Sequence, residues 1–264
     1  MSVVMAVVIV AATGLVGAGI LVIASKYLAV EVDPRITMVA EELPGANCGA
    51  CGFAGCADYA GAIVEDGAEV NLCVPGGAAV AGKVADIMGT DAGDVAQRKA
   101  IVACQGSFDH ATNKYDYAGI DSCKANAALH GGSSSCPYGC LGYGDCAKAC
   151  KFGAIEVRDG LARVNPVLCT GCGACEEACP KRVIWIREVS EKPVVMCANH
   201  HRGAQTRKEC TAGCIGCKKC EQTCPEGAIV VRDNVARIDL DKCVGCRACV
   251  NVCPVKAIAI PKVV

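Results

Sequence analysis

Two stretches of this sequence share one cysteine pattern: CTGCGACEEACP at residues 169–180 and CVGCRACVNVCP at residues 243–254. The spacing C-x2-C-x2-C-x3-C-P is typical of thiolates that wrap a [4Fe–4S] cluster, with the fourth cysteine serving a neighbouring cluster. Zinc sites usually separate their cysteine pairs by a dozen or more residues, and cysteines repeated this closely do not meet disulfide geometry. The pattern therefore predicts iron–sulfur clusters and one-electron chemistry.

The composition supports a chain organised around metal clusters. It has 24 Cys in 264 residues and only 4% aromatic residues, so few large side chains are available to build a core. The net charge is −1 and no basic stripe with interleaved aromatics is present, which argues against nucleic-acid binding. The sequence also lacks a phosphate-binding GxxxxGK[ST] and a GxGxxG between a strand and a helix, so we expect no flavin or NAD in this chain.

The N-terminus carries an apolar segment. Residues 3–24 contain no charged side chain, and about 20 apolar residues are enough to span a bilayer. A signal peptide would need a basic region before a shorter apolar run, so we expect a retained, single-pass transmembrane helix. Because Lys26 and Arg35 follow it and nothing basic precedes it, we expect the body on the cytoplasmic side of the cell (inner, cytoplasmic) membrane. The reducing cytosol also suits thiolate ligands.

The two cysteine stretches belong to longer repeats. Residues 153–180 align with residues 227–254, 74 positions later. Each copy predicts a strand, a tight turn (Asp159-Gly160 or Asp233-Asn234), a second strand and a cysteine run that opens a helix. The expected fold class is α+β, with the transmembrane helix, a small [4Fe–4S] module and two tandem two-cluster ferredoxin-like domains. The expected boundaries are an anchor at 1–28, a single-cluster module at 29–92, a connecting segment at 93–130, and ferredoxin-like domains at 131–190 and 191–264.

A second cysteine run precedes each hairpin, and the fourth cysteine of each run is expected to serve the neighbouring cluster. The later copy has a complete second run. Its expected ligand sets are Cys214, Cys217 and Cys220 with Cys253, and Cys243, Cys246 and Cys249 with Cys224.

In the earlier copy the second run is incomplete, because Tyr143 occupies the position of Cys217 in the later copy. Cys136, four residues before Cys140, is the expected substitute through a longer loop. The resulting sets are Cys136, Cys140 and Cys146 with Cys179, and Cys169, Cys172 and Cys175 with Cys150.

A separate group follows the anchor: Cys48, Cys51, Cys56 and Cys73, with glycines between the first three. Glycine leaves the backbone free to wrap a cluster and to point N–H groups at its sulfurs. We expect a fifth [4Fe–4S] cluster here, with a zinc site as the alternative.

Four cysteines remain, namely Cys104, Cys123, Cys197 and Cys210. They either bind a sixth cluster or are buried, inert thiols. Under the 74-residue shift Cys123 matches Cys197 and Cys136 matches Cys210. If Cys136 and Cys210 serve the same role in both copies, the assignment around Cys136 fails.

Together, the apolar residues 3–24, the Cys48–Cys73 group, VACQG around Cys104 and CLGYGDCAKACKFGAI leading into Cys169 resemble the B subunit of the Rnf electron transport complex. The resemblance implies an electron-transfer subunit that exchanges electrons with soluble ferredoxin. It further implies other membrane and flavin-bearing subunits as partners in an ion-translocating (Na+ or H+) ferredoxin:NAD oxidoreductase. Unlike the shorter family members, this chain has a second ferredoxin unit. Two alternatives stay open, a membrane-tethered reductase or sensor that keeps another protein's cluster reduced, and an electron-transfer subunit of another enzyme such as a hydrogenase.

Overall fold

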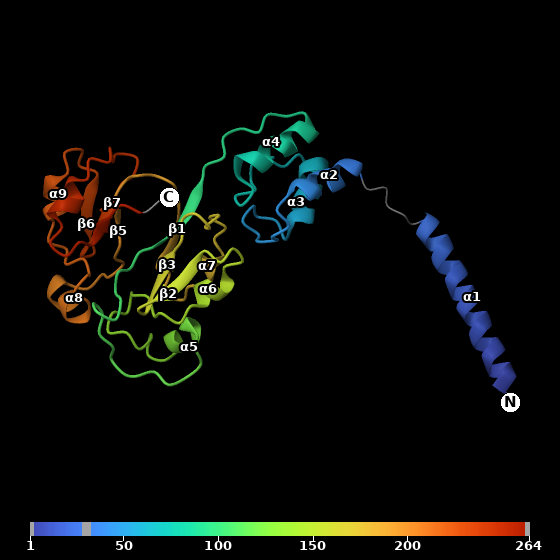
Figure 1. Cartoon of the computed structure of the whole chain (residues 1–264), viewed down its shortest axis with the longest axis horizontal. Coiled ribbons are helices and arrows are strands. Elements are labelled where there is room, and N and C mark those ends of the chain that lie inside the picture. The colour runs from blue at the N-terminus through green and yellow to red at the C-terminus, as the bar shows by residue number, and fades with distance from the viewer. Residues whose placement is uncertain (1–2, 28–32, 262–264) are drawn as a thin grey trace.

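The computed structural model describes residues 3–27 and 33–261, which form an apolar helix, a helical module and two mixed α/β units (Figure 1). The module and the two units follow one another along the chain, and each has its own apolar core. Three separate cores are expected of three packing units, since hydrophobic contacts define about one core per domain.

Helix α1 (Val3–Tyr27) confirms the predicted apolar helix at the N-terminus. Its segment Val7–Lys26 is long and apolar enough to cross a membrane, and none of it is buried against the rest of the protein. Inside the helix the Thr13 hydroxyl donates to the Ile9 carbonyl at 3.0 Å, so this polar group is satisfied within the helix itself. The helix therefore fits a membrane anchor.

Three helices form the module that follows: α2 (Pro34–Glu42), α3 (Cys56–Glu65) and α4 (Gly77–Met88). Helix α2 begins where Asp33 accepts a hydrogen bond from the Arg35 backbone N–H at 2.8 Å and Pro34 occupies the first turn. The core between the helices contains Val39, Tyr59 and Val84, all almost fully buried.

The two α/β units share one design. Each holds an antiparallel hairpin, and two short helices that pack against each other. The first unit contains β1 (Arg98–Val102), α5 (Cys123–Ala128), α6 (Asp145–Ala149), β2 (Ile155–Arg158), β3 (Leu161–Val164), α7 (Ala174–Ala178) and β4 (Ile184–Glu188). The second contains β5 (Val194–Val195), α8 (Gly203–Glu209), α9 (Lys219–Thr223), β6 (Ile229–Arg232), β7 (Val235–Ile238), α10 (Ala248–Val252) and β8 (Ile258–Ala259).

The hairpins confirm the strand–turn–strand prediction. Ile155 pairs with Val164 in the first and Ile229 with Ile238 in the second, and the two hairpins bury equivalent positions. The turn residues all have positive φ, from 50° at Asp233 to 73° at Gly160, as two-residue hairpin loops require. The turn therefore fixes the register that puts the apolar side chains in the core of each unit.

The segment at 93–130, expected to be a connector, is built into the first unit. Its strand β1 pairs antiparallel with β4 along the whole length of both strands, from Arg98 opposite Glu188 to Val102 opposite Ile184. The hydrophobic periodicity of the sequence could not predict this pairing, because periodicity reports local structure and the two strands are far apart in the sequence. The second unit repeats the arrangement in shorter form, where β5 pairs with β8.

At Gly171 the cysteine loop comes close to the backbone of β1. The φ of Gly171 is +74°, and a Cβ there would lie 2.3 Å from the Arg98 carbonyl oxygen. Gly173, in the same loop, also has positive φ (+85°) but open space around it.

We predict that Gly171→Ala lowers the free energy of unfolding by about 2–4 kcal/mol, since a clash adds to the left-handed backbone cost of about 1–2 kcal/mol. Gly173→Ala, the matched control, carries the backbone cost alone. Anaerobic thermal unfolding of the cluster-loaded proteins measures both. Equal losses in the two variants would contradict the predicted contact with β1.

Candidate iron–sulfur centres

The module holds its four cysteines around the start of α3. Cys56 is the first residue of that helix, and its backbone N–H donates to Asn47 Oδ1 at 2.8 Å, which ties it to the loop carrying Cys48. Burial raises the pKa of the Cys73 thiol, and the neighbouring sulfurs of Cys56, Cys48 and Cys51 raise it further. The structure therefore brings the four together, as the sequence predicts.

Tyr59 connects α3 to the loop that carries Cys73. Its hydroxyl donates to the Glu69 carbonyl at 2.6 Å and accepts from the Leu72 N–H at 3.1 Å. Burial raises the pKa of this phenol to about 12, so the hydroxyl keeps its proton and both bonds. The position of Cys73 next to Leu72 is fixed in this way.

In the first unit one expected group is assembled around α7. Burial raises the pKa of the Cys175 thiol to about 12, with further contributions from the sulfurs of Cys169, Cys172 and Cys150. Cys150 reaches this group from the end of α6, as the exchange of fourth cysteines between paired clusters requires.

The other group of the first unit differs from the expectation. Burial raises the pKa of the Cys146 thiol to about 12, and its sulfur neighbours are those of Cys140, Cys123, Cys179 and Cys175. Cys123, and not Cys136, thus lies beside Cys140, Cys146 and Cys179.

Cys123 is held beside this group by hydrogen bonds between the start of α5 and the start of α6, which we call the clamp. Asp145, the first residue of α6, accepts hydrogen bonds from the Ser122 hydroxyl and the Lys124 N–H, both at 2.9 Å. Cys123 stands between these donors at the start of α5. Although partial burial acts against it, these bonds hold the pKa of the Asp145 carboxyl below its usual range. The clamp joins segments too far apart for a motif to reveal it.

In the second unit the structure brings together most of the cysteines that the sequence groups, and the ligand sets stay predictions. Burial raises the pKa of the Cys220 thiol to about 11, and the sulfurs of Cys214, Cys217 and Cys253 contribute. Burial likewise raises the pKa of Cys249, together with the sulfurs of Cys243 and Cys246. Cys224, at the end of α9, packs against the same core.

Cys136 lies elsewhere, against Cys104 and Cys197. Burial raises the pKa of its thiol to about 12, and the sulfurs of Cys104 and Cys197 are its neighbours. Cys104, Cys136, Cys197 and Cys210 all line one hollow between the two units.

The cysteine geometry fits clusters better than disulfides or single ions. None of the 24 cysteines forms a disulfide. Among residues 3–27 and 33–261, no three His, Cys, Asp or Glu side chains converge as they would around one metal ion. Zinc would draw its thiolates within about 4 Å of one another, given Zn–S bonds of about 2.3 Å. Cysteines that share a neighbourhood without such convergence suit the corners of a larger inorganic cube.

Comparison with protein families assigns parts of the chain to iron–sulfur proteins. The models that match are "Putative Fe-S cluster" at residues 43–75, "4Fe-4S binding domain" at residues 162–185 and "4Fe-4S dicluster domain" at residues 213–257. The matches cover the module, part of the first unit and most of the second.

Three curated proteins are similar over most of the chain. The B subunit of the ion-translocating oxidoreductase complex of Methanosarcina acetivorans is 46% identical, over 84% of this chain and 84% of that protein. The B subunit of the proton-translocating ferredoxin:NAD(+) oxidoreductase complex of Clostridium ljungdahlii is 45% identical, over 90% and 84% respectively. The B subunit of the Na(+)-translocating ferredoxin:NAD(+) oxidoreductase complex of Acetobacterium woodii is 42% identical, over 84% and 67%.

The chain belongs to the family of Rnf-complex B subunits. Membership confirms the resemblance inferred from the sequence. It also makes this Rnf protein part of a multi-subunit complex, and the apolar helix α1 fits the membrane association of that complex.

We predict that Asp145→Ala in this Rnf protein releases the start of α5. Losing the two hydrogen bonds removes about 1–2 kcal/mol of local stability, which corresponds to roughly 5–30-fold faster amide exchange. Hydrogen-exchange mass spectrometry of residues 122–126 measures the change. Asp121→Ala is the control, because only the Asp121 backbone carbonyl is bonded, by Lys148 Nζ. Unchanged exchange in Asp145→Ala would contradict the clamp.

Proposed function

We propose that this chain is the membrane-anchored electron-transfer subunit that exchanges electrons between soluble ferredoxin and the membrane subunits of an ion-translocating ferredoxin:NAD oxidoreductase. The observation that carries the proposal is the set of assembled cysteine groups in a member of the Rnf B-subunit family. When bound, [4Fe–4S] clusters accept and release single electrons. The proposed flavin and NAD sites lie on other subunits.

The proposal assigns four cysteine ligands to each of five clusters. The clamp at Asp145 supports the exchange of Cys136 for Cys123 as a ligand. The sets are Cys48, Cys51, Cys56 and Cys73; Cys150, Cys169, Cys172 and Cys175; Cys123, Cys140, Cys146 and Cys179; Cys214, Cys217, Cys220 and Cys253; and Cys224, Cys243, Cys246 and Cys249.

The protein's part in this function is to bury the sulfurs and aim N–H groups at them. Backbone N–H groups donate to the Cys150 sulfur from Ala154 and to the Cys253 sulfur from Ala257, both at 3.3 Å. Such bonds stabilise thiolate ligands and tune cluster potentials. The repeated design supports two tandem two-cluster ferredoxin-like domains, with the first extended to include β1 and α5.

Contacts between parts of the chain keep the cysteine groups next to one another. Lys151, directly after Cys150, donates to the carbonyls of Ala46 at 2.7 Å and Asn47 at 3.1 Å, directly before Cys48. The module and the first unit therefore meet at their cysteine loops. With Lys26 and Arg35 after the apolar helix, we place the body on the cytoplasmic side.

The second unit is the proposed docking surface for ferredoxin. Cys217 and Cys246 are the exposed members of the 24 cysteines. Each is followed by an exposed cation, Lys218 or Arg247, held at positive φ (60° and 64°). The first unit has Gly144 and Gly173 at the equivalent positions. Placing cations in a conformation that suits glycine costs stability, which supports a role for these charges in meeting an acidic partner.

We predict that chemically reduced ferredoxin reduces the clusters of the purified, cluster-loaded protein under anaerobic conditions. Loss of visible absorbance and the appearance of low-potential EPR signals follow the reaction. Redox-inactive, metal-free ferredoxin serves as the control. If no cluster becomes reduced at any ionic strength, the proposed function is wrong.

We predict that the double variant Lys218→Gly, Arg247→Gly slows this reduction roughly tenfold at low ionic strength, since local charge raises association rates by tenfold or more. The backbone favours glycine at both positions, so the variant should unfold at an equal or higher temperature. Arg207→Gln with Lys208→Gln removes two exposed cations from α8 and is the matched control. Equal slowing in both variants would place docking elsewhere.

A further inference from the structure

One buried hydroxyl lies beside a cysteine group without a hydrogen-bond partner. In the part of the chain that the structure describes, Thr170 Oγ1 is the one buried side-chain nitrogen or oxygen with no donor or acceptor within reach. Such groups are rare in folded proteins, because a hydroxyl taken out of water costs free energy unless another hydrogen bond compensates it. The hydroxyl of Thr170 therefore requires an explanation.

Thr170 directly follows Cys169 in the loop before α7. It lines a hollow of about 290 Å³, counted with its opening to solvent, together with Cys150, Cys169, Cys172 and Cys175. These four cysteines are the ligand set that we propose for one cluster of the first unit. The unpartnered hydroxyl thus belongs to the wall of a proposed cluster site.

Strand β1 covers the loop on either side of Thr170. The Ala100 N–H of this strand donates to the Cys169 sulfur at 3.4 Å. One residue after Thr170, a Cβ at Gly171 would lie 2.3 Å from the Arg98 carbonyl oxygen. Contacts at both neighbouring residues therefore hold Thr170 under β1, where its hydroxyl is shielded from water.

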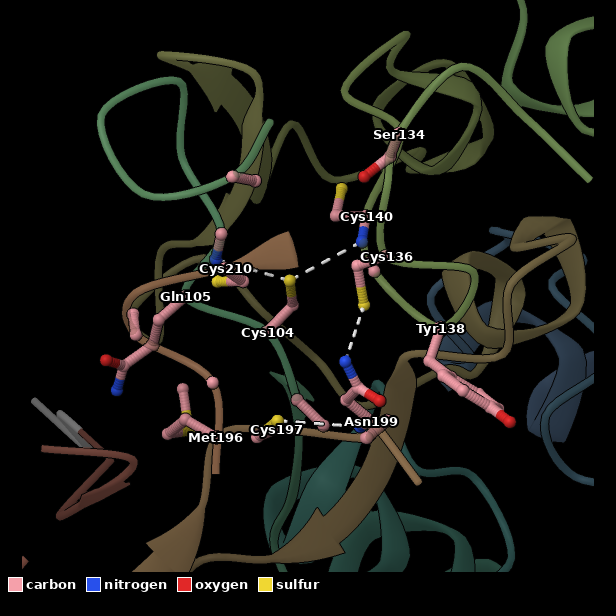
Figure 2. Close-up of a pocket in the computed structure, with 17 residues that line it drawn as sticks. Cys104, Gln105, Ser134, Cys136, Tyr138, Cys140, Met196, Cys197, Asn199 and Cys210 are labelled. Atoms are coloured by element: carbon pink, nitrogen blue, oxygen red, sulfur yellow. Dashed lines mark hydrogen bonds between the residues drawn. The ribbon is translucent and has the colours of Figure 1, made fainter. Parts of the chain in front are cut away.

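A buried amide beside another group of cysteines shows the usual pairing. Figure 2 shows Asn199 Nδ2 directed at the Cys136 sulfur, to which it donates at 3.4 Å. The same nitrogen donates to Glu209 Oε2 at 2.9 Å, and Asn199 Oδ1 accepts from the His201 N–H at 2.7 Å. Against this pairing, the Thr170 hydroxyl is an exception among the polar groups that lie beside cysteines.

The second unit has no hydroxyl at the equivalent place. Val244 corresponds to Thr170 under the 74-residue shift, and it is 64% exposed. The next residue has the same backbone angle in both copies, since φ is +74° at Gly171 and at Gly245. A Cβ at Gly245 would meet nothing within 4 Å, so the loop of the second copy is open at this point. The hydroxyl therefore occurs in the copy that β1 covers.

The cover also removes the cysteines of the first unit from water. Cys169 is buried whereas its equivalent Cys243 is half-buried, and Cys172 is half-buried whereas Cys246 is exposed. Reduction adds one negative charge to a [4Fe–4S] cluster, and a charge is disfavoured where water cannot solvate it. Without compensation, burial would lower the reduction potential of the cluster in the first unit.

We propose that the Thr170 hydroxyl donates a hydrogen bond to a sulfur atom of the cluster in this hollow and thereby raises its reduction potential. The proposal deepens the proposed function and rests on its ligand set. Sulfides and thiolates accept hydrogen bonds, and a donor favours the more negative, reduced state. The hydroxyl keeps its proton, so one electron enters on reduction and nothing else is exchanged. Thr170 thus supplies inside the fold what water supplies at the open loop of the second unit.

The test is an anaerobic EPR redox titration of the purified, cluster-loaded full chain, unaltered and with Thr170→Val. Valine nearly keeps the shape of threonine and removes the hydroxyl. At a fixed ambient potential, the ratio of oxidised to reduced cluster should rise roughly threefold to tenfold for one cluster. Its midpoint potential is then lower by about 30–60 mV. The iron content should equal that of the unaltered protein.

Two further variants separate the hydroxyl from its surroundings. Thr170→Ser keeps the donor and should restore most of the potential that Thr170→Val loses. Val244→Thr adds a hydroxyl at the open loop of the second unit, where it bonds to water, and should leave every midpoint potential unchanged. If Thr170→Val does not load its clusters, Thr170→Ala provides the same measurement with Thr170→Ser as its reference.

Unchanged midpoint potentials in Thr170→Val, at full iron content, would overturn the proposal. The variant should then also unfold at a higher temperature than the unaltered protein, because removing a buried hydroxyl that has no partner relieves a desolvation cost. A loss of potential that Thr170→Ser fails to restore would equally contradict the hydrogen bond, since the change would follow from packing alone.

The outcomes for this residue and for the proposed function are separate. A potential that falls in Thr170→Val, in a protein that ferredoxin cannot reduce, would refute the proposed function and leave the role of Thr170 standing. Reduction by ferredoxin with equal potentials in both proteins would refute the role of Thr170 and leave the proposed function standing.

Discussion

The desolvation of sulfur is the constraint on which the rest of this structure depends. The chain has few aromatic side chains, and its cores use cysteines where other proteins use larger residues: Cys146, Cys169 and Cys175 in the first unit, and Cys197, Cys220 and Cys249 in the second. A thiolate in such surroundings is unfavourable unless a cation and N–H donors compensate it. We therefore expect packing of the core and loading of metal to be coupled, as in other small metal-dependent domains.

The two α/β units show how a repeat can keep its fold while its surface changes. Hairpin register, turn conformation and buried positions are the same in both copies. The cysteine loops differ between the copies, and the strand pair β1–β4 of the first is longer than β5–β8 of the second. Tyr143 replaces the cysteine found at Cys217, and glycines replace the cations Lys218 and Arg247. The first copy has no exposed cysteine and is bonded to the module, whereas the second exposes two cysteines. One scaffold thus presents its cysteines differently in the two copies.

The sequence predicted the local features well. Cysteine spacing located the runs, the dipeptides Asp159-Gly160 and Asp233-Asn234 located the hairpins, and hydropathy located α1. It failed where a residue is placed by contacts distant in the chain. Cys123 reaches Cys146 through Asp145, and β1 reaches β4 across most of the first unit. Spacing alone favoured Cys136 as the missing ligand, because it is the nearest unassigned cysteine in the sequence. In the structure Cys136 instead lies against Cys104 and Cys197.

The gathering of cysteines from four segments has a consequence for how the protein is made. Cys104 leaves the ribosome roughly a hundred residues before Cys210, an interval of about 5–20 seconds at ordinary rates of synthesis. During that time Cys104 and Cys136 are not yet covered by the segment that carries Cys210. Their sulfurs are therefore accessible to oxidants and to iron from solution. The module and the first unit can close as they emerge. The junction closes only when the last domain folds against them, so its completion reports that the whole chain is in place.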